Sequence, residues 1–410
     1  MALFSRQLSG ETYGALIDIG SGSVLVAIVH SKTNEQHPTI VWAQREHAPL
    51  KNIDSIDQSA RAVTTALLNA CLQLDTVGRK ALNEYNSSAK IATVQATISA
   101  PWSYTVTKTI NYTQDEDFSV TDELFNELIR TTEDQIAADL SANEAVNELG
   151  LQIITQATMD MLTNGYRVTD PLGSKARQFS ISRANVVAQE YLTNSLDETC
   201  EKLFTSKDCR KLSFILMMYS VVRDLLPETY EVCLVDITYE ATEIGVVRDG
   251  SLQYCTHTPF GSFSLAREIS AVLNVPLHET FGYLHTENPF AFLETITDKQ
   301  KEGIEAIFEA YIQKIDKLFH ETGDSLSIPK RIAIHSDLKS EVFFKSMIEK
   351  AAKRSLKTNP TITLVSKEIM SQTYDETAKT SFMNSHTDSA LLLSALFFHT
   401  HHKSSFFVYV

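Results

Sequence analysis

The sequence predicts an α/β fold of two related lobes, with a smaller α/β unit inserted in the first lobe. Three observations lead to this prediction. A strand hairpin that carries an acid opens the chain, the same pattern returns about half a chain later, and strand-like and helix-like sequence lies between the two copies. A length of 410 residues is enough for two or three domains with sizeable cores.

The first copy of the pattern is a strand, a glycine-rich loop and a second strand. Residues 16–23 (LIDIGSGS) carry Asp18 near the strand end, and the small residues after it leave backbone N–H groups open to a phosphate. Residues 24–29 are apolar and β-branched, which predicts a strand. Dinucleotide-binding and P-loop motifs need a helix there, and Leu25 stands where the third dinucleotide glycine belongs. The loop is therefore predicted at a hairpin tip, where Asp18 can hold a magnesium ion through its water ligands.

The second copy begins with residues 232–236 (VCLVD), an apolar strand that ends in Asp236. Residues 238–255 then add a short loop, a strand, a hairpin turn and a further strand. Two such units indicate a duplicated fold, in which Asp18 and Asp236 face each other across one cleft.

The segment between the two copies is typical of a separate small α/β unit. Residues 91–98 and 104–110 alternate between apolar and polar residues, as half-buried strands do. Residues 119–140 predict a helix with Thr121 as its N-cap, and residues 194–204 predict a closing helix. The predicted units are a first lobe at residues 11–88, an inserted unit at 89–206, the second hairpin at 207–265, a helical subdomain at 266–320 and the rest of the second lobe at 321–410.

The chain resembles the actin-like ATPase superfamily, whose fold is a duplicated ribonuclease-H-like unit, and within it the cell-division protein FtsA and the pilus-assembly protein PilM. Residues 18–23 resemble the first phosphate motif of that superfamily, and residues 236–242 resemble the second. Residues 168–173 (VTDPLG) resemble a loop of the FtsA inserted subdomain, and residues 261–269 (GSFSLAREI) resemble the segment after the second hairpin. The ordered set covers nearly the whole chain.

The resemblance implies that ATP and Mg²⁺ are clamped between the two hairpins, with Asp18 and Asp236 orienting the water ligands of the metal. It leads us to no general base. The implied phosphate- and nucleotide-binding residues are Asp18, Gly20, Ser21, Gly22, Ser23, Asp236, Thr238, Thr242, Gly261 and Ser336.

Two of the three nucleotide motifs depart from the superfamily pattern. Tyr239 and Glu240 stand in the second loop where glycines are usual, and they would crowd or repel phosphates. Ser336 and Asp337 stand where two glycines normally lie against the adenosine. We therefore expect weak ATP binding or slow hydrolysis, and a nucleotide-free scaffold stays open as an alternative. The lost glycines also argue against a metabolic kinase of the same superfamily.

The composition narrows the class of partner. A net charge of −15 argues against nonspecific nucleic-acid binding and unaided docking on anionic lipid. Five scattered cysteines without C-x-x-C spacing favour a reducing cytosol. No segment has the apolar length that spans a bilayer, and residues 406–410 are too short for firm anchoring. His399, His401 and His402 fit a polar helix end better than a metal site.

The first functional expectation is a cytoplasmic, FtsA-like scaffold in bacterial cell division. By the resemblance it would bind ATP, self-associate into filaments and link a tubulin-like division protein to the membrane machinery. The alternative is a PilM-like component of type IV pilus assembly, which would bind a peptide of an inner-membrane protein beside the inserted unit. In both cases we expect membrane contact only through a partner, and no nucleic acid.

Overall fold

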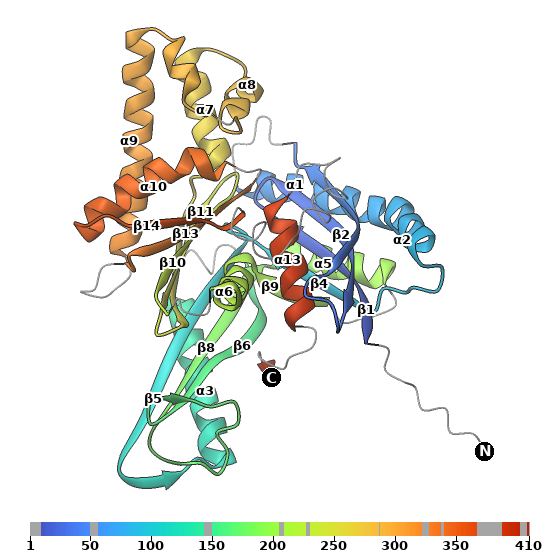
Figure 1. Ribbon diagram of the computed structural model, residues 1–410, viewed down its shortest axis with the longest axis vertical. Helices are drawn as coiled ribbons and strands as arrows, with labels where there is room; N and C mark the ends of the chain where they lie inside the picture. The colour runs from blue at the N-terminus through green and yellow to red at the C-terminus, as the bar shows by residue number, and fades with distance from the viewer. Residues whose placement is uncertain are drawn as a thin grey trace.

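Within the described residues, the computed structural model contains three five-stranded sheets. Two sheets form the two lobes, and the third extends from them in the inserted unit (Figure 1). The structure describes residues 10–49, 56–142, 150–204, 209–226, 230–286, 288–321, 328–337, 340–366, 388–401 and 408–409.

The first lobe is a sheet covered by helices on both faces (Figure 1). Its strands, in the order β3-β2-β1-β4-β9, are β1 (Glu11–Ile19), β2 (Ser23–Lys32), β3 (Thr39–His47), β4 (Thr93–Ile98) and β9 (Cys209–Ser213). One face carries α1 (Ile56–Gln73), the π-helical turn η1 (Leu74–Gly78), α2 (Arg79–Tyr85) and α5 (Glu190–Leu203), and the other carries α6 (Phe214–Leu225) and α13 (Ser389–His401).

The alternation of β1 explains why both faces are covered. Ala15 and Ile17 pack in the core with α1, whereas Leu16 packs in the core with α6 and α13. Helix α13 approaches the strand at Gly14, where a Cβ would lie 2.3 Å from the Phe398 ring. Only a glycine allows this close approach.

The second lobe repeats the first. Its strands, in the order β12-β11-β10-β13-β14, are β10 (Val232–Ile237), β11 (Thr242–Arg248), β12 (Ser251–Thr258), β13 (Arg331–Ser336) and β14 (Thr361–Leu364). Its helices are α7 (Ser262–Leu273), α8 (Leu277–Tyr283), the 3-10 turn η2 (Ala291–Glu294), α9 (Asp298–His320) and α10 (Glu341–Leu356). Strand β10 pairs antiparallel with β11 and parallel with β13, as β1 pairs with β2 and β4. The predicted duplicated α/β fold is therefore confirmed.

The inserted unit has its own sheet and helix, drawn at the bottom of Figure 1. Its elements are β5 (Ser103–Ser119), α3 (Asp122–Ala142), β6 (Leu151–Thr163), β7 (Tyr166–Arg167), β8 (Lys175–Gln189) and β15 (Val408–Tyr409). The sheet order is β15-β6-β8-β5, and β7 pairs with β6. Leu128 and Ile129 of α3 pack against Phe179 and Ile181 of β8. The Thr121 hydroxyl accepts the Leu124 N–H at 3.2 Å, so this residue caps α3 as predicted.

The sheets divide the chain differently from the predicted residue boundaries. The boundary at residue 89 assigns β4 to the inserted unit, but β4 pairs with β1 in the first lobe. Strand β9 pairs with β4, so it also belongs to the first lobe. Helix α13 packs on β1 and β2 rather than within the second lobe. Long-range pairing of this kind has no local signal in the sequence.

Helix positions agree best where the apolar period is strong. The predicted stripe of α9 is confirmed as core, with Ile304, Tyr311 and Ile315 buried. Helix α6 begins at Phe214 because Ser213 ends β9 and accepts the Leu216 N–H with its hydroxyl. No helix in the described ranges combines the length and apolar character that crossing a membrane requires.

Candidate functional site

The candidate site is the place between the lobes where the loop after β1 meets the loop after β10. Ser21 Oγ donates a hydrogen bond to Thr238 Oγ1 at 2.8 Å. The Glu240 N–H donates to Ser21 Oγ, also at 2.8 Å. Loops that clamp a phosphate point such groups at the ligand, whereas these groups point at each other.

An aromatic side chain of the second loop covers the glycine of the first. A Cβ on Gly22 would lie 2.6 Å from the Tyr239 ring, so the two residues are in direct contact. Tyr239 is buried against Phe263 and Phe281, and its hydroxyl lies 3.1 Å from His47 Nδ1. The predicted crowding at residue 239 is therefore present, and the ring fills the space above the first loop.

The second loop is also fixed from its own lobe. A Cβ on Gly261 would lie 2.2 Å from the Thr238 carbonyl oxygen, and the Ser262 N–H donates to that oxygen at 2.9 Å. Glu240 is turned to Arg267, with which it forms a two-point ion pair at 2.7 and 2.8 Å. The repulsion expected from an inward-pointing Glu240 does not arise in this conformation.

The other predicted first-loop groups also have partners within the chain. The Gly20 N–H donates to the Ser23 carbonyl at 2.9 Å, and the Gly20 carbonyl accepts the Trp102 indole N–H at 3.1 Å. Ser23 Oγ accepts from Arg45 at 2.6 Å. The Gly20 N–H, the donor among these groups, would have to break its bond to Ser23 before it could bind a phosphate.

Asp18 has partners within the chain. Its carboxylate accepts a hydrogen bond from Thr97 at 2.7 Å and lies 3.8 Å from the Arg45 guanidinium. Arg45 also pairs with Asp388 at 2.6 Å. Burial raises the pKa of Asp18 to about 6, although the charge of Arg45 and the bond from Thr97 oppose this rise.

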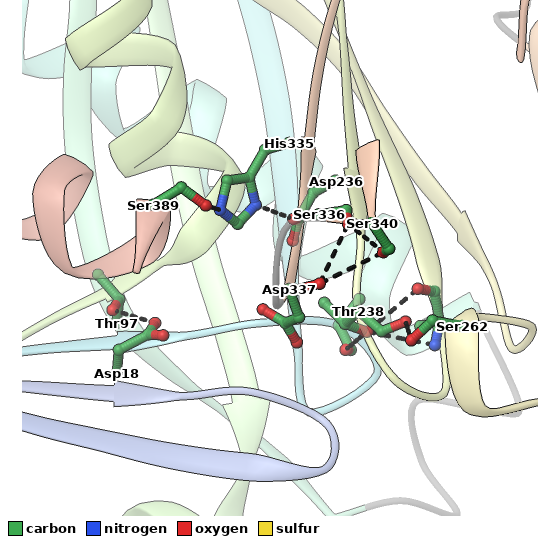
Figure 2. Close-up of polar contacts among 12 residues, drawn as sticks. Asp18, Thr97, Asp236, Thr238, Ser262, His335, Ser336, Asp337, Ser340 and Ser389 are labelled. Atoms are coloured by element: carbon green, nitrogen blue, oxygen red, sulfur yellow. Dashed lines mark hydrogen bonds and ion pairs between the residues drawn. The ribbon is translucent and has the colours of Figure 1, made fainter. Parts of the chain in front are cut away.

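Asp236 has a cation of its own. His335 Nδ1 lies 2.7 Å from the Asp236 carboxylate, and His335 Nε2 lies 2.9 Å from the Ser389 hydroxyl (Figure 2). Burial by itself lowers the pKa of an imidazole. The hydrogen bond and charge of Asp236 outweigh burial and raise the pKa of His335 to about 9.

The order Ser389, His335, Asp236 is the order of the catalytic triad of serine hydrolases. In a triad the imidazole must be neutral, because it takes a proton from the serine hydroxyl. A pKa of about 9 keeps His335 protonated at neutral pH. The arrangement therefore acts as a buried ion pair with a hydrogen-bonded serine, and it lacks a base for acyl transfer.

The residues predicted to contact the adenosine are buried and bonded locally. The Ser336 hydroxyl contacts the Ser340 hydroxyl (Figure 2). Burial raises the pKa of Asp337 to about 7, and a Cβ on Gly20 would lie 3.5 Å from its carboxylate. Thr242 faces the interior of the second lobe, where its hydroxyl donates to the Phe260 carbonyl at 2.8 Å.

The predicted histidine cluster has structural partners. His399 lies 2.9 Å from the Ser31 hydroxyl and 3.0 Å from the Glu35 carbonyl. His401 is buried, and His402 lies outside the described residues. Within the part of the chain that the structure describes, no group of His, Cys, Asp or Glu is arranged to hold a metal ion.

The sequence reasoning did not identify Thr97, Arg45, His335 or Asp388. Two of them carry a signal that could have found them: Thr97 and His335 are the register partners of Asp18 and Asp236 on the next parallel strand. A search for the next buried strand in each copy would have aligned them.

A comparison with solved structures identifies the fold. A solved structure described as "PilM-PilN type IV pilus biogenesis complex" shares 12% identity over 93% of this chain and 97% of that one, with a TM-score of 0.54. The chain has an actin-like fold. The ethanolamine utilization protein EutJ from Carboxydothermus hydrogenoformans shares 10% identity over 94% of this chain and 89% of that one, with a TM-score of 0.42. No protein-family model matches the sequence, and no characterised protein sequence matches it either.

The residues of this actin-like cleft do not fit a nucleotide and its magnesium ion in the described conformation. The two loops are bonded to each other, and Tyr239 lies over Gly22. Asp18 and Asp236, the predicted metal-orienting acids, are each paired with a side-chain cation.

Proposed function

We propose that this chain is an actin-like scaffold that keeps its lobes closed without a nucleotide. The observation that carries the proposal is the direct hydrogen bond between Ser21 and Thr238, one residue from each phosphate-type loop. The superfamily resemblance implies a nucleotide clamped between these two loops. Here the loops supply that contact themselves.

The charges of the cleft support the same proposal. A buried carboxylate without a counter-charge is costly, so an empty nucleotide site would leave Asp18 and Asp236 unfavourable. Arg45 lies beside Asp18 and His335 beside Asp236, and these two cations reduce that cost within the folded chain. In the closed state, cations of the chain thus stand beside the two acids that a bound metal ion would otherwise face.

Titration of the full chain with Mg-ATP tests the proposal by calorimetry and by thermal unfolding. We expect no binding heat and no rise in Tm. A site with a Kd of about 10 µM would stabilise the folded state by about 2.7 kcal/mol at about 1 mM ligand, which a melting curve resolves easily.

Asp18→Ala provides the matched control for this titration. Micromolar binding by the wild type that this substitution abolishes would contradict the proposal and restore the ATP-dependent alternative. An ATP-binding protein of the same fold, measured in parallel, establishes that the assay detects ligand.

We further propose a PilM-like partner, a peptide that adds to the inserted sheet. Val408 and Tyr409 of β15 pair antiparallel with Thr158 and Ala157 of β6. This edge of the sheet therefore accepts an added strand, and strand addition is a common way to bind an extended peptide. The similarity in fold to the PilM of a PilM-PilN complex supports this alternative over the cell-division role.

The strand-accepting edge can be tested with the chain's own tail. A synthetic peptide of residues 404–410 is labelled, and its binding is measured to the full chain and to a chain that ends at Lys403. We expect the shortened chain to bind the peptide at least tenfold more tightly, because its edge is vacant. Equal affinities would contradict this use of the edge.

The remaining expectations of the division role stay predictions. Filament formation, a tubulin-like partner and a cytoplasmic location at the membrane through a partner have no supporting contact in a single chain. Sedimentation of the protein with and without Mg-ATP tests the first of them, and a closed, nucleotide-independent scaffold gives the same sedimentation in both.

A further inference from the structure

Two cysteines meet where the chain returns from the inserted unit to the first lobe. Cys200 lies in the last turn of α5, where its carbonyl accepts the Phe204 N–H. Cys209 is the first residue of β9 and pairs with Val94 of β4. Cys200 belongs to the core of the first lobe and Cys209 packs against that core, where the two thiols interact with each other.

A second contact fixes the same register between α5 and β9. Lys211 lies two residues after Cys209, so both side chains leave the strand on one face. Asp197 lies three residues before Cys200, so both lie on one face of the helix. Lys211 Nζ and the Asp197 carboxylate are 2.6 Å apart. The thiol contact is therefore one of two parallel bridges between these elements.

The contact between the two thiols distinguishes them, because it lowers the pKa of Cys200 and raises the pKa of Cys209. The Cys209 thiol donates a hydrogen bond to Cys200, and this bond lowers the pKa of Cys200 although burial opposes it. The charge of Asp197 raises the pKa of Cys200, and the charge of Lys211 lowers it. A thiolate is the reactive form of cysteine, and a neighbouring thiol can then close a disulfide.

We propose that Cys200 and Cys209 form a reversible disulfide when the protein meets hydrogen peroxide. The Cys200 thiolate attacks one peroxide oxygen, the O–O bond breaks, and the departing hydroxide takes a proton to become water. Cys209 then attacks the sulfur of the sulfenic acid, loses its proton, and a second water leaves. Overall, two thiols are oxidised and one peroxide is reduced to two waters.

The bond would tie the end of α5 to the edge strand of the first lobe. Strand β9 also contacts β6 of the inserted unit, and the Thr155 hydroxyl bonds the Lys211 carbonyl there. Oxidation would therefore stiffen the junction through which the inserted unit is attached.

The test treats the folded full chain with hydrogen peroxide, unfolds it, and counts free thiols by alkylation. Of the five cysteines, we expect two to be protected, with the protein lighter by two hydrogen atoms and a proteolytic peptide that links Cys200 to Cys209. Dithiothreitol should restore all five thiols. Cys200→Ser and Cys209→Ser should each abolish the cross-link.

Cys233→Ser, in the second lobe, is the matched control and should lose two thiols like the wild type. Cys71 is the other candidate for a disulfide with Cys200, because both are buried in the same core. A link between Cys71 and Cys200, or five alkylated thiols after treatment, would overturn the proposal. Circular dichroism of each variant before oxidation shows that it is folded.

Discussion

The two halves of the cleft solve the same problem with different side chains. In each lobe a buried acid sits on the central strand, and the next parallel strand supplies its register partner. In the first lobe that partner is Thr97, which is neutral, so the positive charge comes from Arg45 on β3. In the second lobe the partner is His335, which supplies both the hydrogen bond and the charge.

The two loops also differ from each other, because one has the small residues of a phosphate loop and the other has the side chain that covers them. The first loop keeps small residues between Gly20 and Ser23, as a phosphate loop does, but it is covered from outside. The second loop carries the cover, because Tyr239 packs on Gly22. A loop with the sequence of a phosphate motif can therefore be covered by a side chain of the opposite loop. Whether the site is open to a ligand depends on both loops together.

Arg45→Met tests the first lobe's half of the comparison and should lower the free energy of unfolding more than the other substitutions do. The substitution leaves Asp18 and Asp388 buried without their counter-charge, which costs about 3–5 kcal/mol for a buried pair. The free energy of unfolding, measured in urea at pH 7, gives the value. Arg267→Met is the control: it breaks the more exposed pair with Glu240 and should cost about 0–1 kcal/mol. Similar losses for both variants would show that Arg45 stabilises the fold no more than a surface cation does.

His335→Gln tests the second lobe's half of the comparison and should lower the stability by an amount that depends on pH. The pKa of His335 rises on folding from 6.5 to about 9, so the folded state holds the proton more tightly. The stabilisation is complete below about pH 6.5 and is lost as pH rises through about 9. It amounts to ~3 kcal/mol, at about 1.36 kcal/mol for each pKa unit.

Urea midpoints between pH 6 and 10 test the role of His335. The wild type should lose stability over this range because of this group, and His335→Gln should lose much less. A wild-type profile with the same slope as that of the variant would mean that His335 stays neutral in the folded protein.

Thr97→Val should have the smallest effect, because it removes one hydrogen bond and no charge. We expect a loss of about 1.5 kcal/mol at pH 8, the lower range for a bond to a charged group. The loss should shrink at pH 5, because the pKa of Asp18 is about 6 and a protonated acid accepts the bond less strongly. A loss at pH 5 equal to that at pH 8 would contradict an ionised Asp18.

The sequence predicts the secondary-structure elements of this fold better than the side-chain contacts between distant residues. The two hairpins, the capped helix α3 and the apolar stripe of α9 follow from local periodicity and capping, and all are present. Arg45 could not be predicted in its role, because its partner Asp388 is 343 positions away. The same holds for Ser21 and Thr238, which are 217 positions apart. Distant pairs of this kind are set by the packing of lobes, which a single sequence does not display.

The inserted sheet also has a mechanical consequence. Strand β5 touches the second lobe through the Thr107 hydroxyl, which donates to the Gln253 carbonyl at 2.5 Å, while β6 touches β9 in the first lobe. Arg167, on the hairpin strand β7, reaches the Asp249 carbonyl at 2.8 Å. A force applied to the far end of the insert is therefore transmitted to both lobes and does not separate them. A movement of one lobe relative to the other would have to break the contacts that the insert makes with one of them.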